Sequence, residues 1–188
     1  MNDLHVHTSW CNHAAGTMEE YVVSAKIKGL TGLGFAVHLP LMPQKEKLWL
    51  NERELNLYFD AGKDLQNRYE IPVYLGAEAD FVPGQEDKTQ RLLDKYPFDY
   101  VYGSVHFLNG WGFDQYRYIK RFADYDPVEL YKKYYSALEQ AVKTGLFDIV
   151  AHLDIIKVFG CKIEQELDEF YSLADSIRAS GMSVEINT

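Results

Sequence analysis

Short runs rich in Val, Ile, Tyr and Phe alternate along the chain with longer runs whose apolar residues recur at helical spacing. The short runs predict six strands, at 4–7, 33–38, 73–79, 100–106, 149–153 and 183–186. The longer runs predict helices near 17–29, 51–68, 86–96, 126–144 and 164–179. Strands that alternate with helices are typical of βα units, so we expect an α/β fold with a parallel sheet.

Two of the predicted helices have readable ends. Thr17 and Glu20 form a capping box at the start of the first helix, and Gly29 is expected to end it. Asp126 and Pro127 are a favoured N-cap and first residue for the fourth helix. With 188 residues and no evident linker, the chain is long enough for one core, and we expect a single domain over 1–188.

Composition narrows the classes of function. A formal net charge of −9 argues against nucleic-acid binding. The densest basic run, with Arg117 and Arg121, is short enough to be a solvated face. No apolar stretch approaches a membrane span, and no secretory signal is predicted. Two cysteines, Cys11 and Cys161, make no disulfide framework, so we expect a cytoplasmic protein.

Each predicted strand ends at or near a side chain that can bind a metal ion. These residues are His5, His7, His38, Glu78, His106, His152 and Glu185. In βα barrels the carboxyl ends of the strands form the active site, so we expect these side chains to lie together.

The spacing of His5 and His7 is the most specific signal. Residues i and i+2 of a strand point to the same face, so the two imidazoles can bind one ion. His13 and Cys11 follow in a predicted loop, and His13 is the better ligand candidate because the other candidates are nearly all nitrogen donors. Each isolated histidine can instead be a hydrogen-bonded structural residue.

Glu78 is the one carboxylate in the favoured set, and a carboxylate can bridge two cations. Asp80 is a weaker ligand candidate, and Asp154 can either orient His152 or cap the next element. Six histidines and one glutamate favour zinc, iron or manganese over calcium or magnesium. Seven ligands imply two or three divalent ions, which suit hydrolysis of a phosphate ester.

Five short motifs resemble those of the polymerase-and-histidinol-phosphatase (PHP) family. They are "LHVHT" at 4–8, "VH" at 37–38, "GAEAD" at 76–80, "GSVH" at 103–106 and "AHLD" at 151–154. "HVHTSWCNH", "GSVHFLNGWGFD" and "VEINT" resemble its histidinol-phosphate phosphatase branch. The likeness covers nearly the whole chain, and together the motifs are specific.

The resemblance implies a (β/α)7-type barrel, here incomplete with about six βα units. It implies that the metal ligands are His5, His7, His13, His38, Glu78, His106 and His152, with Glu78 bridging two ions. It also implies hydrolysis of L-histidinol phosphate, a small phosphorylated metabolite, by a metal-activated water in histidine biosynthesis.

The sequence departs from the family at two places. Val37 stands where the family usually has Asp. After Thr188 the family continues with a helix, an Asp-x-His pair of ligands and phosphate-binding basic residues. We therefore expect a truncated form, whose open edge after the last strand favours self-association.

Four alternatives stay open. An amidohydrolase also begins with His-x-His, but requires a lysine where this chain has His106. The nuclease branch of the family requires affinity for DNA. A third alternative is a phosphoesterase for another small phosphate ester. The fourth is a weakly active or inactive metal-binding remnant, which a phosphate-release assay distinguishes from an enzyme.

Overall fold

A computed structural model describes residues 1–41 and 49–187. The chain divides into two compact units, the first comprising Met1–Ala79 and Arg91–Tyr102, the second Asp80–Gln90 and Gly103–Thr188. Each unit is described by itself. The expectation of a single domain stays a prediction.

The first unit is built on parallel strands in the order β1-β2-β3, followed by the start of β4. The strands are β1 (Asn2–Val6), β2 (Gly32–His38), β3 (Val73–Asp80) and β4 (Val101–Ser104). His38 is paired in register with Glu78, so two predicted site residues lie side by side where β2 ends. The first three predicted strands are thus confirmed to within two residues at each end.

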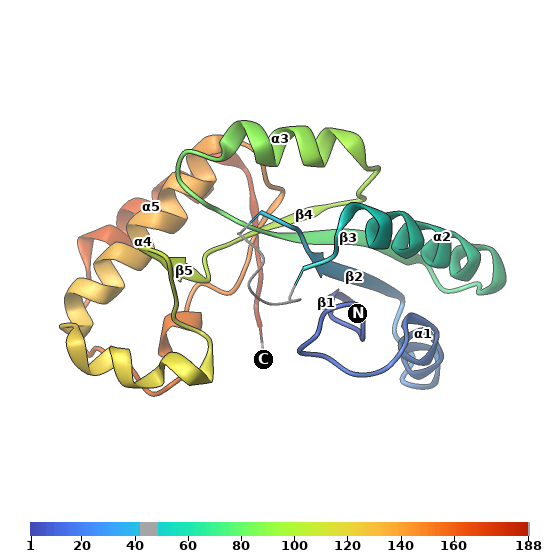
Figure 1. Ribbon diagram of the computed structural model, residues 1–188, viewed down its shortest axis with the longest axis horizontal. Helices are drawn as coiled ribbons and strands as arrows, with labels where there is room; N and C mark the ends of the chain where they lie inside the picture. The colour runs from blue at the N-terminus through green and yellow to red at the C-terminus, as the bar shows by residue number, and fades with distance from the viewer. Residues whose placement is uncertain (42–48, 188) are drawn as a thin grey trace. The chain divides into compact units, whose positions relative to one another are not determined.

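Helices α1 (Met18–Ile27) and α2 (Glu52–Arg68) belong to this unit, and α3 (Glu86–Lys95) contributes its last residues. The capping box predicted at Thr17 and Glu20 is present, and Asn51 with Glu54 forms a second one at the start of α2. Gly29 has a φ of +71° just beyond α1, as expected of a residue that ends a helix. Helix α2 runs along β2 and β3 (Figure 1).

Two tyrosines tie the strands of this unit together. The Tyr58 hydroxyl, on α2, donates to the carbonyl of Gly76 at 3.0 Å. The Tyr100 hydroxyl donates to the carbonyls of Leu4 at 2.6 Å and Phe35 at 3.1 Å. Tyr100 therefore bonds both β1 and β2, and Gly76 leaves room for its ring.

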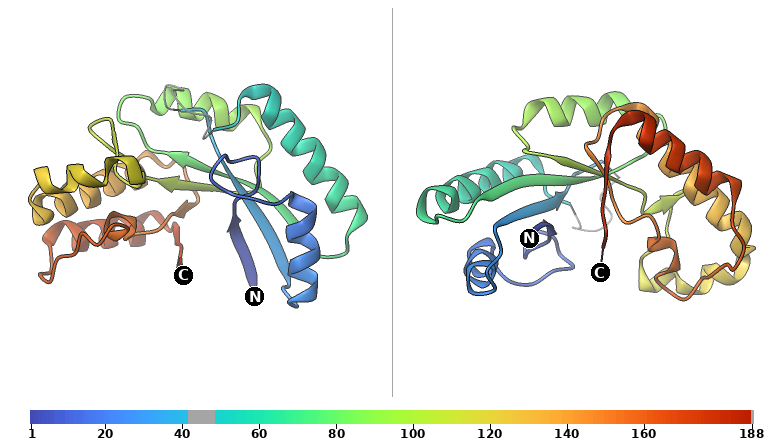
Figure 2. Two further views of the ribbon diagram at one scale, coloured as in Figure 1. Left: turned by 60° about the horizontal axis from the view of Figure 1, so that its bottom comes forward. Right: turned by 180° about the vertical axis from the view of Figure 1, so that it is seen from behind.

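The second unit contains the end of β4, then β7 (Ile149–Val150) and β8 (Ser183–Val184), in the order β4-β7-β8. Its long helices, α4 (Pro127–Thr144) and α5 (Asp168–Ser180), lie side by side in both views of Figure 2. Asp126 caps α4 by accepting from the Glu129 N–H at 3.1 Å, with Pro127 as the first helical residue. The predicted N-cap and the predicted first residue of this helix are both confirmed.

Three predicted strands are longer than the observed ones. The predictions 100–106, 149–153 and 183–186 shorten to Val101–Ser104, Ile149–Val150 and Ser183–Val184. His106, His152 and Glu185 consequently follow their strands instead of belonging to them. Likewise His7 lies one residue beyond β1, and α5 begins at Asp168 instead of 164.

A hairpin and two 3₁₀ helices were not predicted. β5 (Phe107–Leu108) and β6 (Trp111–Gly112) are antiparallel, and Asn109 and Gly110 between them both have positive φ. An Asn-Gly pair between apolar residues is a strong hairpin signal, so "LNGW" could have revealed this turn. The 3₁₀ helices span Tyr116–Asp124 and Ile155–Lys157.

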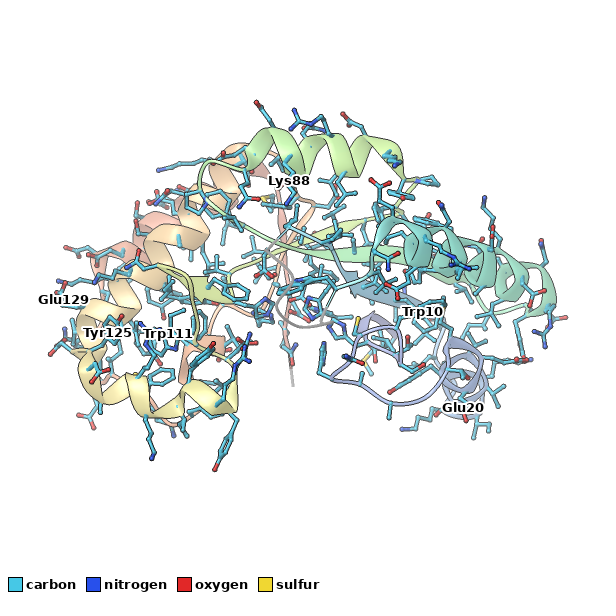
Figure 3. All side chains as sticks on the ribbon, in the orientation of Figure 1. Trp10, Glu20, Lys88, Trp111, Tyr125 and Glu129 are labelled. Atoms are coloured by element: carbon cyan, nitrogen blue, oxygen red, sulfur yellow. The ribbon has the colours of Figure 1, made fainter. Side chains whose placement is uncertain are left out.

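Trp111 holds the hairpin against the segment that follows it. Its ring stacks on Tyr125 with centroids 5.0 Å apart (Figure 3). The Arg121 guanidinium lies over the Trp111 ring, 5.2 Å from its centroid. Phe122 packs edge-on against the same ring. The basic run that includes Arg121 therefore belongs to an exposed 3₁₀ helix anchored by an aromatic cluster.

No helix in the described part of the chain is long and apolar enough to cross a membrane.

Candidate metal centre

In the first unit three imidazoles surround one buried carboxylate oxygen. Glu78, only 2% exposed, presents Oε2 to His5 Nε2 at 3.1 Å and to His7 Nε2 at 3.2 Å. His38 Nδ1 lies 3.4 Å from the same oxygen. The ends of β1, β2 and β3 thus bring together four residues that are up to 73 positions apart in the sequence.

These separations fit a metal site. Ligands about 2.0–2.1 Å from a tetrahedral zinc ion lie roughly 3.3 Å from one another, close to the observed nitrogen–oxygen distances. A buried carboxylate also requires a compensating positive charge. In addition, the buried Nδ1 of His7 has no hydrogen-bond partner. The donor set of imidazole nitrogens and one carboxylate is therefore suited to a divalent transition metal.

His13 joins this cluster through another histidine. Its Nε2 lies 3.0 Å from His38 Nε2, and the His7 and His13 rings are 4.8 Å apart. His7, Cys11 and His13 also form a group that could hold an ion. Burial raises the pKa of the Cys11 thiol to about 11, so it is neutral at pH 7 in the absence of a metal.

The second unit holds the other two predicted histidines. The rings of His106 and His152 are 5.0 Å apart, and both side chains are largely buried. The His152 N–H donates to Glu185 Oε2 at 2.8 Å, while its carbonyl accepts from the Tyr134 hydroxyl at 2.7 Å. Glu185, which follows β8, and Tyr134 of α4 therefore fix the backbone that carries His152.

Two acidic residues considered beside the main ligand set, Asp80 and Asp154, contact other side chains. Asp80, a weaker ligand candidate, accepts from the ring and the backbone of His106. Asp154 stands at the N-cap position of the short 3₁₀ helix, but its side chain makes no capping hydrogen bond there and pairs with Lys157. Nothing in the order of residues distinguishes Asp80 as a partner of His106, because the two are 26 positions apart.

Comparison with known protein families gives a match to the PHP domain over residues 3–188. The chain belongs to the PHP domain family. A probable histidinol-phosphatase of Deinococcus radiodurans is 37% identical over 99% of this chain and 72% of its own length. A histidinol-phosphatase of Bacillus subtilis is 25% identical over 99% of this chain and 80% of its own length.

Solved structures of PHP relatives have the same fold. A histidinol phosphate phosphatase of Lactococcus lactis matches with a TM-score of 0.85 and 20% identity, over 99% of this chain and 72% of its own. That crystal structure contains zinc, L-histidinol and phosphate. A putative histidinol phosphatase of Listeria monocytogenes matches with a TM-score of 0.80 and 21% identity, over 100% of this chain and 82% of its own. The expected barrel-type α/β fold of about six βα units is thereby confirmed.

Proposed function

We propose that this protein is a metal-dependent phosphomonoesterase that hydrolyses L-histidinol phosphate to L-histidinol and phosphate. The observation that carries the proposal is the cluster of three imidazoles on one buried oxygen of Glu78. Membership of the PHP domain family and the 37% identical relative support both the reaction class and the substrate.

We propose as metal ligands His5, His7, His13, His38, Glu78, His106 and His152, for two or three ions of zinc, iron or manganese. Zinc is favoured because the Lactococcus lactis structure holds it. Divalent ions, when bound, lower the pKa of a coordinated water and stabilise the charge that develops on a phosphoryl group.

The residues of the chain supply position and charge for this chemistry. Glu78 presents an anionic oxygen to three imidazoles and keeps them aimed at one point. Its burial makes its charge act in a low-dielectric environment, where electrostatic interactions are stronger than in water. His13 acts at the margin of this set, since its ring contacts His38 at the exposed edge of the cluster.

Removal of metal tests the reaction class. We expect a chelator to abolish phosphate release from L-histidinol phosphate, and zinc or manganese to restore it. We also expect the chelated protein to melt at a lower temperature, because ions that bind only the folded state stabilise it. Phosphate release, metal content and thermal melting are measured on the same samples.

Three results would contradict the proposal. Full phosphate release from a sample shown to be metal-free would exclude the metal-dependent mechanism. A metal-loaded protein that hydrolyses another small phosphate ester faster than L-histidinol phosphate would exclude the substrate. A loaded protein inactive on every ester tested would be the metal-binding remnant instead.

The cytoplasm, where Cys11 and Cys161 remain reduced, is the compartment we propose.

We further propose that the 188-residue chain self-associates through β8. This strand lies at the end of the order β4-β7-β8, with Val184 41% and Ile186 91% exposed. Sedimentation at several concentrations should reveal a dimer that Val184→Lys weakens, because a charged edge strand resists pairing. Val23→Lys, at a position on α1 with the same 41% exposure, is the control. A monomer at every concentration would refute this proposal.

A further inference from the structure

The ring of His106 is held by one carboxylate oxygen at two points. Asp80 Oδ1 lies 2.8 Å from His106 Nδ1 and accepts from the His106 backbone N–H at 3.1 Å. Both side chains are largely buried, Asp80 at 3% exposure. Two bonds from one residue to one oxygen fix the ring relative to its own backbone.

This contact also determines where the imidazole carries its proton. A carboxylate accepts hydrogen bonds, so the neutral ring that suits it has its proton on Nδ1. The Nε2 atom of this tautomer carries a lone pair, so Nε2 is the atom that can bind a metal. The opposite tautomer would put the Nδ1 lone pair against the carboxylate at 2.8 Å, which is repulsive.

Ser104 also lies beside this nitrogen. Its hydroxyl lies 3.4 Å from His106 Nδ1, farther than Asp80, and it is neutral. A hydrogen bond to a charged acceptor is roughly twice as strong as a neutral one, and it is shorter. Asp80 rather than Ser104 should therefore dominate the choice of tautomer.

We propose that Asp80 is a positioning residue, which holds His106 as the Nδ1–H tautomer with Nε2 available to a metal ion. This goes beyond the role of His106 as a ligand, and it rests on the proposed function only for the identity of what Nε2 binds. Asp80 contacts neither substrate nor metal in this account, and it acts through His106.

Nitrogen-15 NMR of the histidine rings in the metal-free protein tests the tautomer directly. The chain has six histidines, and loss of one signal in His106→Gln assigns the ring. We expect His106 to be protonated on Nδ1 in the parent, and Asp80→Ala to give a mixture of tautomers. Asp80→Asn, which keeps an acceptor of similar shape, is a second variant should the alanine protein fail to fold.

Zinc titration supplies the second measurement. Loss of a partner of a metal ligand typically lowers metal affinity by about 10–100-fold. We expect a weakening of that size for the weakest-bound zinc in Asp80→Asn, and little change in Ser104→Ala. Asp154→Asn controls for loss of a carboxylate that pairs with Lys157.

The proposal is overturned if His106 in the parent carries its proton on Nε2, or on both nitrogens at neutral pH. It is equally overturned if Asp80→Asn, whose neutral amide is a weaker acceptor, keeps the parent zinc affinity, or if the ring signals show the parent tautomer in Asp80→Ala, which removes the carboxylate. These signals are read without metal or substrate, so they stand whether or not the protein hydrolyses L-histidinol phosphate. Failure of the proposed function alone is seen separately, as the expected tautomers in the parent and in Asp80→Ala together with no phosphate release.

Discussion

Replacing Glu78 by Gln is expected to lower phosphate release by more than about 100-fold, the upper end of what loss of a partner of a metal ligand costs. The amide keeps the shape of the side chain but removes the negative charge that faces His5, His7 and His38. Without that charge the cluster has only neutral donors, so two ions held close together repel each other uncompensated. Phosphate release and zinc content per chain measure the effect.

His13→Gln and Glu52→Gln provide the comparison for this experiment. His13 lies at the exposed margin of the cluster and contacts His38, so its loss should reduce phosphate release less than loss of Glu78. Glu52 pairs with Lys95 on the surface and should tolerate the same substitution without effect. Equal phosphate release by Glu78→Gln and the parent would refute the role of Glu78, provided that both proteins melt cooperatively.

The pattern of the sequence predicts the elements of this fold better than their ends. Alternation of apolar runs gives the six strands, and side-chain caps such as Thr17 and Asp126 mark where helices begin. The short strands β7 and β8 were overestimated because apolar residues continue past the last ladder bond. Helix α5 starts late since Leu167 precedes it with no capping side chain.

The candidate site likewise has features that the sequence predicts and features that it does not. Ligand-type residues at strand ends were found because they interrupt apolar runs, and the pairing of His38 with Glu78 follows from parallel strands of matched length. Contacts made by Asp80 and Glu185 were not found, because they depend on which distant loop turns back toward each residue. Bonds between a side chain and a distant backbone, such as Glu185 to His152, leave no periodic signal.

The same limit applies to the tyrosines that support the site. Tyr100 and Tyr102 read as ordinary strand residues, yet Tyr100 bonds β1 and β2, and Tyr102 stacks on His5 with centroids 4.2 Å apart. The bulk of the Tyr100 side chain requires glycine opposite, at Gly34 and Gly76. The glycines of "GLGFAVH" and "YLGAEAD", which the pattern alone does not explain, are the signal that a large side chain crosses these strands.

Gly76→Ala should therefore be one of the most destabilising single substitutions in the protein. An added Cβ would lie 2.2 Å from the Tyr100 ring, closer than side-chain atoms approach each other. Overpacking of a core costs about 1–3 kcal/mol. Displacing the ring also breaks the hydroxyl's bonds to Leu4 and Phe35, at about 1 kcal/mol each. We expect the free energy of unfolding, measured with urea, to fall by about 3–5 kcal/mol.

A double-mutant cycle separates this mechanism from a general intolerance of β3 to alanine. In a Tyr100→Ala background the ring is absent, so Gly76→Ala should cost much less than in the parent. Gly32→Ala, whose Cβ would meet the side chain of exposed Asn2 at 3.0 Å, should be milder because that side chain can move. Equal cost of Gly76→Ala in both backgrounds would contradict the mechanism. Because Leu4 precedes His5, the displaced ring should also weaken zinc binding, so the fold and the metal site should fail together.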